Sequence, residues 1–238
     1  MTEIVWLGHA AFYIKTDGVS FLIDPWIDNP MAPKHVSEEY LSPDYILVTH
    51  AHNDHFGETE HILKSSKKTI CICIAEIDTI LSSFGVSGNQ IIGMNKGGTK
   101  VLKNGIKVTA VHADHSSSYT TENGDVLYGG EAMGFIIHTK DNHRIYHTGD
   151  TAIFGDMKII NDIYKPDIVC ICIGDNYTMG PIEAAYTLNH LLTNVSLAIP
   201  MHYKTFGPLT GTPEEVKRLL TRNDIHIQTL IPGTPFSL

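Results

Sequence analysis

The sequence is short of cysteine, of long apolar runs and of clustered positive charge, and each shortage argues against a class of protein. Four cysteines occur among 238 residues, as Cys71 with Cys73 and Cys170 with Cys172. Both pairs lie in apolar, strand-like runs, so we expect buried thiols rather than disulfides or thiolate–metal bonds. No stretch approaches the ~18 apolar residues of a transmembrane helix. The first residues lack the basic and apolar regions of a signal peptide, and we therefore expect a cytoplasmic protein.

Positive charge is the scarcer sign. Lysine and arginine total 17 against 26 acidic residues, which gives a net charge of −9 with histidine neutral. Because no basic run is longer than Lys67-Lys68, neither nucleic acid nor a membrane is expected as a main partner. The expected partner is a small-molecule substrate, and the sequence leaves a homo-oligomer open.

Histidine is concentrated in one short stretch. The apolar run Tyr45–Val48 reads as a strand, and His50, His52, Asp54 and His55 follow it directly. His50 and His52 are two residues apart, so one extended segment can direct both side chains at one point. Asp54 and His55 follow where the chain must turn, and they would serve a second point nearby. Ions in two-metal hydrolytic sites lie about 3.5–4 Å apart, so we predict a dinuclear metal site rather than a solvated histidine-rich loop.

The run Thr49-His50-x-His52-x-Asp54-His55-x-Gly57 resembles the signature of the metallo-β-lactamase fold superfamily. From Gly8-His9 to about Phe206, the chain resembles the small metal-dependent hydrolases related to the ascorbate-6-phosphate lactonases. The resemblance implies an α/β (α+β) fold, a four-layer αββα sandwich of two similar halves. It also implies a single metallo-hydrolase domain over residues 1–238.

A weak internal repeat predicts the same architecture. Phe12-x-Ile14-x-Thr16 is echoed by Phe135-x-Ile137-x-Thr139, and Pro43-Asp44 by Pro166-Asp167. We expect the second half to start near Met133. Helices between apolar strands are typical of an α/β chain. Strands are expected within residues 4–7, 11–16, 21–24, 45–48, 69–75, 91–99, 100–111 (a hairpin), 145–150, 168–173 and 197–202, helices over 58–65 and 76–84 and from 181 and 213, and an irregular rim over 25–43.

Ligands from outside the loop are implied by the resemblance. His115, before the hydroxyl residues Ser116-Ser117-Ser118, matches the third histidine of the first metal, and His112 stays open as the alternative. Asp150 matches the carboxylate that bridges both metals, a position that suits carboxylate oxygen. The implied ligands are His50, His52 and His115 for the first metal, Asp54, His55 and His202 for the second, and Asp150 between them.

Further residues are expected around these ligands or the substrate. Asp24 ends a strand where the family has an acid, and we expect it to hold a ligand or the histidine loop in position. A simple strand-end cap is the alternative for Asp24. Strand-to-helix loops at sheet edges often line pockets, and Lys204 is placed to meet an anionic substrate group. The other residues expected here are His9, His147, Asp175, Asn176, Tyr177 and Tyr203.

These residues predict a hydrolase. Two cations bridged by Asp150 would share a water, lower its pKa from ~15.7 toward 7 and direct the hydroxide at a carbonyl or phosphoryl centre. Asp54 could orient this hydroxide, so Asp54 and Asp150 are the catalytic candidates. Zinc is the default metal for a histidine-rich site, while the carboxylates leave manganese, iron or nickel open. The predicted substrate is a small ester or lactone, with anionic small molecules favoured over polynucleotides.

Three other functions fit the sequence less well. A phosphodiesterase or nuclease is disfavoured by the acidic charge and by the lack of room for an inserted nucleic-acid domain. A diiron redox protein is disfavoured because that branch usually replaces the second histidine of the loop, and His52 is intact. A metal-binding scaffold without turnover is disfavoured by the complete set of ligand-type residues.

Overall fold

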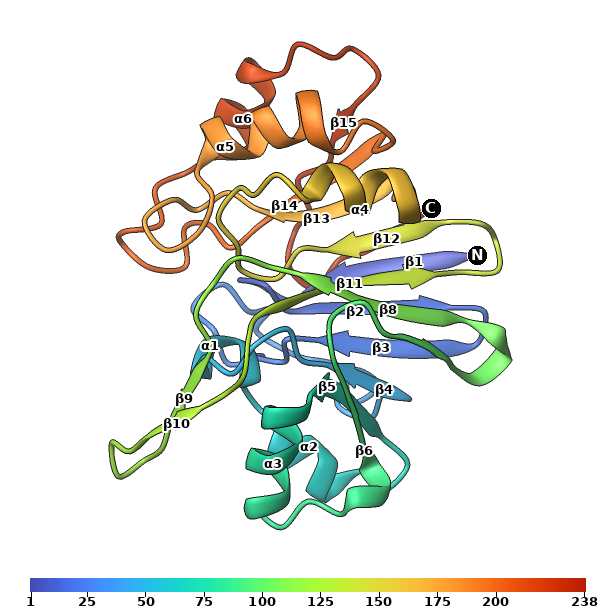
Figure 1. Ribbon diagram of the computed structural model, residues 1–238, viewed down its shortest axis with the longest axis vertical. Helices are drawn as coiled ribbons and strands as arrows, with labels where there is room; N and C mark the ends of the chain where they lie inside the picture. Colours follow the sequence, from blue (N-terminus) through green and yellow to red (C-terminus); the bar gives the residue numbers. More distant parts are fainter.

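Two seven-stranded sheets, with helices on their outer sides, make up the structure, a computed structural model that describes residues 1–238. Helices α2 and α3 lie at one end of the molecule and α4, α5 and α6 at the other, with the strands between them (Figure 1). This is the four-layer αββα sandwich that the sequence predicts. The helices are α1 (Asn53–Phe56), α2 (Thr59–Ser65), α3 (Ala75–Ser83), α4 (Met157–Tyr164), α5 (Pro181–Tyr186) and α6 (Pro213–Leu219).

The two sheets repeat one strand order. In each sheet, the first three neighbouring pairs are antiparallel and the last three are parallel. The first sheet runs β16 (Pro235–Ser237), β1 (Thr2–Trp6), β2 (Phe12–Thr16), β3 (Val19–Ile23), β4 (Tyr45–Leu47), β5 (Ile70–Ile74), β6 (Ile91–Met94). The second runs β7 (Thr99–Val101), β8 (Lys107–His112), β11 (Met133–His138), β12 (Arg144–His147), β13 (Ile168–Cys172), β14 (Leu197–Met201), β15 (His226–Ile227).

The second half therefore starts earlier than predicted. Its first strand is β7, beginning at Thr99, and not the strand that contains Met133. The hairpin of β7 and β8 forms around Asn104-Gly105 as expected, but β8 also pairs with β11 along its whole length. That second pairing joins segments separated by an intervening loop, so local sequence signals do not reveal it.

Local chemistry explains why the predicted elements form. Asp17 and Gly18 both have positive φ (51° and 73°) and connect β2 to β3, as expected for an Asp-Gly hairpin turn. Helix α6 starts with Pro213 in its first turn, and Thr212 Oγ1 accepts the Glu215 backbone N–H at 3.2 Å. After α5 the helix widens into a single π-helical turn, Thr187–Leu191. None of the helices combines the length and apolar character that crossing a membrane requires.

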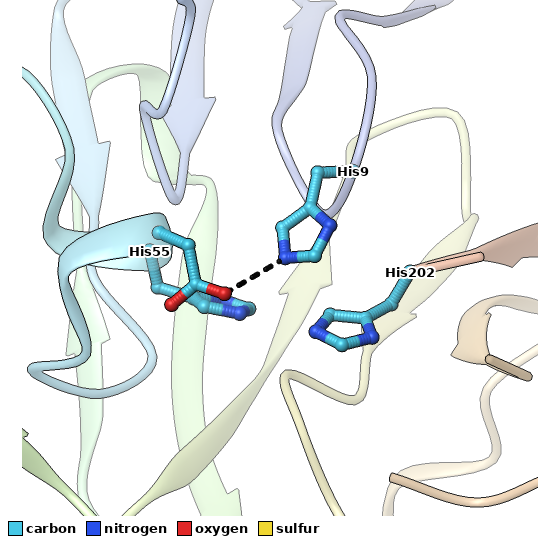
Figure 2. A group of neighbouring side chains, drawn as sticks. His9, His55 and His202 are labelled. Atoms are coloured by element: carbon cyan, nitrogen blue, oxygen red, sulfur yellow. Dashed lines mark hydrogen bonds and ion pairs between the residues drawn. The ribbon is translucent and has the colours of Figure 1, made fainter. Parts of the chain in front are cut away.

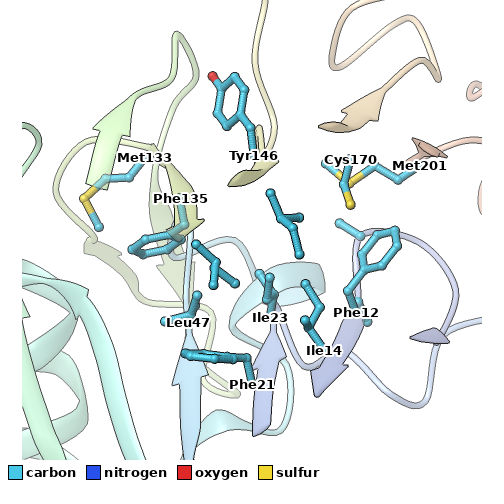
Figure 3. Close-up of a cluster of buried hydrophobic side chains, with 14 of the residues drawn as sticks. Phe12, Ile14, Phe21, Ile23, Leu47, Met133, Phe135, Tyr146, Cys170 and Met201 are labelled. Carbon is cyan, nitrogen blue, oxygen red and sulfur yellow. The ribbon is translucent and has the colours of Figure 1, made fainter. Parts of the chain in front are cut away.

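The core lies between the sheets. Phe12, Ile14, Phe21, Ile23 and Leu47 from the first sheet face Met133, Phe135, Cys170 and Met201 from the second, while Tyr146 points to the other side of its sheet (Figure 3). All are buried, and full burial of one large apolar side chain contributes about 1.5–3 kcal/mol. The cysteines are buried and free, as the sequence predicts. This packed layer fixes the ends of the strands on both sides of it.

One hairpin was not predicted. A hairpin of β9 (Ser118–Thr120) and β10 (Val126–Tyr128) projects from the sandwich, beside the short helix α1 (Figure 1). Its strands bury little apolar surface, so they carry no alternating hydrophobic signal. The predicted irregular rim, residues 25–43, contains turns and no helix or strand. It reaches the site through Trp26, whose ring packs edge-on against His9 with centres 5.1 Å apart.

Candidate metal centre

Histidine and aspartate side chains from both sheets meet at the edge where their parallel strands end. The loop of residues 50–55 follows β4 and enters α1, while His115, Asp150 and His202 follow β8, β12 and β14. The structure brings all seven predicted ligands together, and it adds His9, which follows β1. Potential ligand atoms lie within 4.8 Å of one another in three groups: His50, His52 and His115; His9, Asp54, His55 and His202; and His50, His55 and Asp150.

His50, His52 and His115 form the first group. His50 Nε2 lies 3.0 Å from His52 Nδ1. The His115 ring centre is 5.0 Å from that of His50 and 5.1 Å from that of His52. Thr49 Oγ1 lies 3.0 Å from the opposite nitrogen of His50, and Ser116 Oγ lies 3.4 Å from that of His52. Since a ligating imidazole usually donates through its other nitrogen, His50 Nε2 and His52 Nδ1 are the atoms left to share a cation.

Asp54, His55 and His202 form the second group, with His9 beside them (Figure 2). The rings of His55 and His202 are stacked, with centres 5.6 Å apart. His9 Nε2 lies 3.2 Å from Asp54 Oδ2, and His9 Nδ1 lies 2.9 Å from Thr205 Oγ1. Burial, and then the nearby His202, lower the pKa of His9 to about 4, so its ring is neutral at physiological pH. A neutral ring that accepts from Thr205 donates its single N–H to Asp54, which makes His9 a support for this carboxylate.

Asp150 lies between the two groups. Its Oδ2 is 2.9 Å from His202 Nε2 and 3.7 Å from His115 Nε2. The same oxygen is 3.2 Å from His55 Nε2. One carboxylate therefore reaches histidines of both groups, as a bridging ligand must.

The chemistry of these side chains fits divalent cations. Three buried atoms at the centre have no hydrogen-bond partner: His55 Nε2, Asp150 Oδ1 and His202 Nδ1. Unpaired buried polar atoms are costly, and a cation would satisfy such lone pairs. Imidazole nitrogen with carboxylate oxygen is a donor set that suits zinc and neighbouring transition metals.

The charge distribution supports the same assignment. Burial alone would lower the pKa of His55, but the Asp150 and Asp24 carboxylates raise it well above its ordinary value. Burial alone would raise the pKa of Asp150, but His202 and His55 hold it well below its ordinary value. A proton on His55 and a cation compete for one lone pair, so metal binding would release this proton.

Asp24 holds two histidines in position. Its Oδ2 lies 2.8 Å from His55 Nδ1 and accepts the Thr49 hydroxyl at 2.7 Å. Its Oδ1 accepts the Thr49 backbone N–H at 2.8 Å. Because the Thr49 hydroxyl donates to Asp24, it accepts from His50 Nδ1. Asp24 is fully buried and has a positive φ of 46°, an unfavourable backbone for this residue that its hydrogen bonds maintain.

The expected histidines outside the ligand set have other contacts. His147 is buried, with Nε2 3.0 Å from the Ala10 carbonyl oxygen, and its Nδ1 accepts the Gly149 N–H at 3.1 Å. It therefore shapes the turn that leads to Asp150. His112, the alternative to His115, lies outside the ligand groups and packs its ring on Phe154 with centres 4.8 Å apart.

A cavity of about 500 Å³ opens onto the centre. Tyr177 lines it, whereas Asp175 and Asn176 shape the loop that carries Tyr177 and do not line the cavity themselves. Neither Tyr203 nor Lys204 lines the cavity: Tyr203 is buried and stacks on Trp6 with ring centres 5.5 Å apart, and Lys204 is exposed to solvent outside the lining. The lining residues are His52, Asp54, His115, Ser116, Asp150, Tyr177, His202 and Phe206.

Sequence reasoning missed several residues of the site. Thr49, Ser116 and Thr205 place hydroxyls against ligand-type or supporting histidines, and Phe206 lines the cavity. The first two adjoin predicted ligands in sequence, which is a signal that could have been used. Thr205 and Phe206 depend on the turn after His202, where both His202 and Lys204 have positive φ. No local pattern in the sequence predicts where that turn directs them.

Comparisons with known proteins agree with this geometry. The family model described as "Beta-lactamase superfamily domain" matches residues 3–202. A UPF0173 metal-dependent hydrolase of Rubrobacter xylanophilus is 42% identical over 219 residues, which cover 91% of this chain and 88% of the relative. One from Koribacter versatilis is 40% identical over 237 residues, covering 99% and 97%. The solved structure of Igni18, a metallo hydrolase from Ignicoccus hospitalis, is 32% identical with a TM-score of 0.85 and 100% coverage of both chains.

Proposed function

The chain belongs to the metallo-β-lactamase superfamily and, within it, to the UPF0173 metal-dependent hydrolases, and from that premise we propose a dinuclear hydrolase of small esters or lactones. The observation that carries the proposal is the position of Asp150. Its carboxylate lies within 3.7 Å of histidine nitrogens from both ligand groups, while Asp24, another buried acid nearby, is occupied by hydrogen bonds.

Each metal has its own set of ligands in this proposal. His50, His52 and His115 would hold the first metal, and Asp54, His55 and His202 would hold the second. Asp150 would be shared between the two positions. Zinc is the proposed metal because five of the seven ligands are histidines, although manganese, iron and nickel accept the same donors.

The residues of the chain prepare the reaction around these ions. When bound, the metals supply a water of lowered pKa and a Lewis acid for the ester carbonyl. Asp150 sets the spacing between the two positions. Asp54 orients the attacking oxygen, and His9 fixes the Asp54 carboxylate through its N–H. The Asp24–Thr49 pair fixes the rings of His50 and His55, so the ligands need little reorganisation when substrate arrives.

The alternative functions receive less support. The cavity lining contains no lysine or arginine, which a phosphodiester backbone would require for charge pairing. His52 lies among the first group of ligands, which weighs against a diiron redox site of the kind that replaces it. The single-domain organisation over residues 1–238, the cytoplasmic location and a homo-oligomeric state stay predictions.

Metal removal tests the proposal most directly. Purified protein that is stripped with a chelator and refilled should contain about two transition-metal ions per chain by mass spectrometry. Its melting temperature should fall on stripping by several degrees and recover on refilling, because the ligands join both sheets. Hydrolysis of a panel of lactones, methyl esters and phosphodiesters should follow the metal content. A stripped protein that takes up no metal, or a filled one that cleaves only phosphodiesters, would refute the proposal.

A further inference from the structure

The cavity above the metal centre has a polar floor and two aromatic walls. Six of its eight lining residues are histidine, aspartate or serine, and the other two are Tyr177 and Phe206. Building on the proposed hydrolase, we infer that Tyr177 and Phe206 select substrates that carry an uncharged aromatic group next to the scissile ester. The two residues are therefore specificity determinants rather than parts of the metal centre.

Phe206 is held in place by other rings. It stacks on Trp26, with ring centres 5.6 Å apart and planes inclined by 23°. It also meets His9 edge-on at 5.6 Å. The turn that carries it is closed by two backbone hydrogen bonds, from Lys204 N to Leu209 O and from Leu209 N to Phe206 O, each 3.0 Å. Phe206 is nevertheless 37% exposed, so part of a fixed ring remains available to a ligand.

Tyr177 is 57% exposed on a loop that the structure constrains strongly. Asp175 and Asn176 before it both have positive φ, 71° and 58°, a backbone that costs energy in residues other than glycine. The loop is closed by a hydrogen bond from Asp175 N to Met179 O at 3.1 Å. Met179 N then donates to Thr151 O at 2.9 Å, directly after Asp150. Tyr177 is thus anchored to the segment that carries the bridging carboxylate.

Apart from the proposed metals, the cavity offers no lysine or arginine side chain to an anionic substituent. No lysine or arginine lines it, and Lys204, the nearest candidate by sequence, is exposed outside the lining. A phosphate or carboxylate group would normally be met there by a charge-assisted hydrogen bond. Aromatic rings instead attract flat apolar groups through stacking and edge-to-face contacts, in addition to the burial of apolar surface. The walls therefore favour neutral aromatic substituents.

Three methyl esters with one leaving group test this selectivity. Methyl phenylacetate carries a neutral ring, methyl acetate carries none, and monomethyl succinate carries an anion. The metal-filled protein should hydrolyse methyl phenylacetate with a kcat/KM at least about tenfold above those of the other two. Binding is measured separately by saturation-transfer NMR with 1-phenylpropan-2-one, a neutral ketone that has the same ring and no ester bond.

Substitutions assign the selectivity to the two walls. Tyr177→Ala and Phe206→Ala should each remove most of the preference for methyl phenylacetate over methyl acetate, while the metal content is retained. Phe206→Leu, which keeps an apolar wall, should lose less than Phe206→Ala. Tyr177→Arg should move the preference toward monomethyl succinate. The matched control is Tyr128→Ala, because Tyr128 is a tyrosine exposed by 69% that lies outside this cavity.

The outcomes separate this inference from the proposed function. If no ester is cleaved but the ketone binds in a manner that depends on Tyr177 and Phe206, the selectivity stands and the hydrolase proposal fails. If the esters are cleaved but neither wall variant changes their ratio, the selectivity is refuted and the hydrolase proposal stands. A preference of the wild-type protein for monomethyl succinate, or ketone binding that survives in both alanine variants, would also overturn the inference.

Discussion

The two halves of the sandwich share a scaffold and contribute to the site in different ways. β4 and β13 occupy the same place in their sheets, and each follows a Pro-Asp pair. The Asp44 carboxylate accepts the Ser20 N–H at 3.0 Å, and Asp167 accepts the Arg144 N–H at 2.6 Å. These two caps are equivalent because Ser20 and Arg144 lie on the preceding strands, β3 and β12. The loops that follow β4 and β13 nevertheless differ in chemistry.

The first half concentrates its ligands, whereas the second half distributes them. The loop after β4 supplies His50, His52, Asp54 and His55, while the loop after β13 supplies the cavity residue Tyr177. The second half instead gives one ligand after each of β8, β12 and β14. The shared strand order thus fixes where the strands end, and the residue types at each end decide whether it offers potential metal ligands or lines the cavity.

The strand ends of β3 and β12 show how one position diverged. In the first sheet, Phe12 of β2 lies opposite Ile23 of β3. In the second sheet, Phe135 of β11 lies opposite His147 of β12. In this register Thr148, and not Asp150, takes the place of Asp24. Asp150 lies two residues farther along the chain, beyond the turn at Gly149. With these two extra residues, the Asp150 carboxylate reaches Nε2 of His55, while Asp24 contacts Nδ1 on the opposite side of the same ring.

Removing the negative charge of Asp150 should give the largest effect, and removing that of Asp24 is the matched comparison. Asp150→Asn should lower metal content and reduce ester hydrolysis by about a thousandfold or more, because the bridging anion is lost. Asp24→Asn should reduce activity less, since it weakens the orientation of His55 without removing a ligand. Metal analysis and kcat/KM on both variants decide the point. Equal losses would mean that the two positions are not distinct in function.

Removing the negative charge of Asp54, in the loop after β4, should have the next largest effect. Asp54→Asn keeps the size of the side chain but removes the oxygen charge that holds the second metal and orients the attacking oxygen. Activity should fall by about a hundredfold or more, and some of the first metal should remain because His50, His52 and His115 are intact. Metal content and turnover are measured on the same preparation. Unchanged turnover would place the chemistry elsewhere.

A third test compares two histidines on either side of one strand end. His115→Ala should lower the metal content by about one ion, because it removes a ligand of the first group. His112→Ala should leave metal content nearly unchanged, since its ring contacts Phe154 outside the ligand groups. The two variants differ by three positions, so each controls for the other. The reverse result would reassign the ligand to His112.

The smallest effect on activity is expected at Asp44 and Asp167, the equivalent caps before β4 and β13. Asp44→Asn and Asp167→Asn each weaken a cap between neighbouring strands, and each should lower the free energy of unfolding by about 1 kcal/mol. The Ser20 hydrogen bonds lower the pKa of Asp44 against the effect of burial. Its contribution is therefore present above the ordinary carboxyl pKa and lost as pH falls through the lowered value. Urea unfolding at pH 7 measures both variants, and a large loss of metal in either would contradict a purely structural role.

Several elements followed from sequence because their signals are local. The Asp17-Gly18 turn, the capping box of α6 and the strand before His50 each depend on neighbouring residues. The start of the second half at Thr99 did not follow, because β8 joins the second sheet through its pairing with β11. The β9–β10 hairpin was also missed, since its exposed strands carry little hydrophobic pattern.

The sequence by itself determined the histidine loop, because ligand-type residues two and three apart on one turning segment already point toward common centres. It determined His115, Asp150 and His202 as candidates only through resemblance. The tertiary structure decided that they meet, that Asp150 reaches past the place of Asp24, and that His9 donates to Asp54. It also decided that Phe206 and Tyr177, rather than Lys204, line the cavity. These facts depend on how the two sheets pack and on where their strand ends align. Both are set by contacts between residues far apart in the chain.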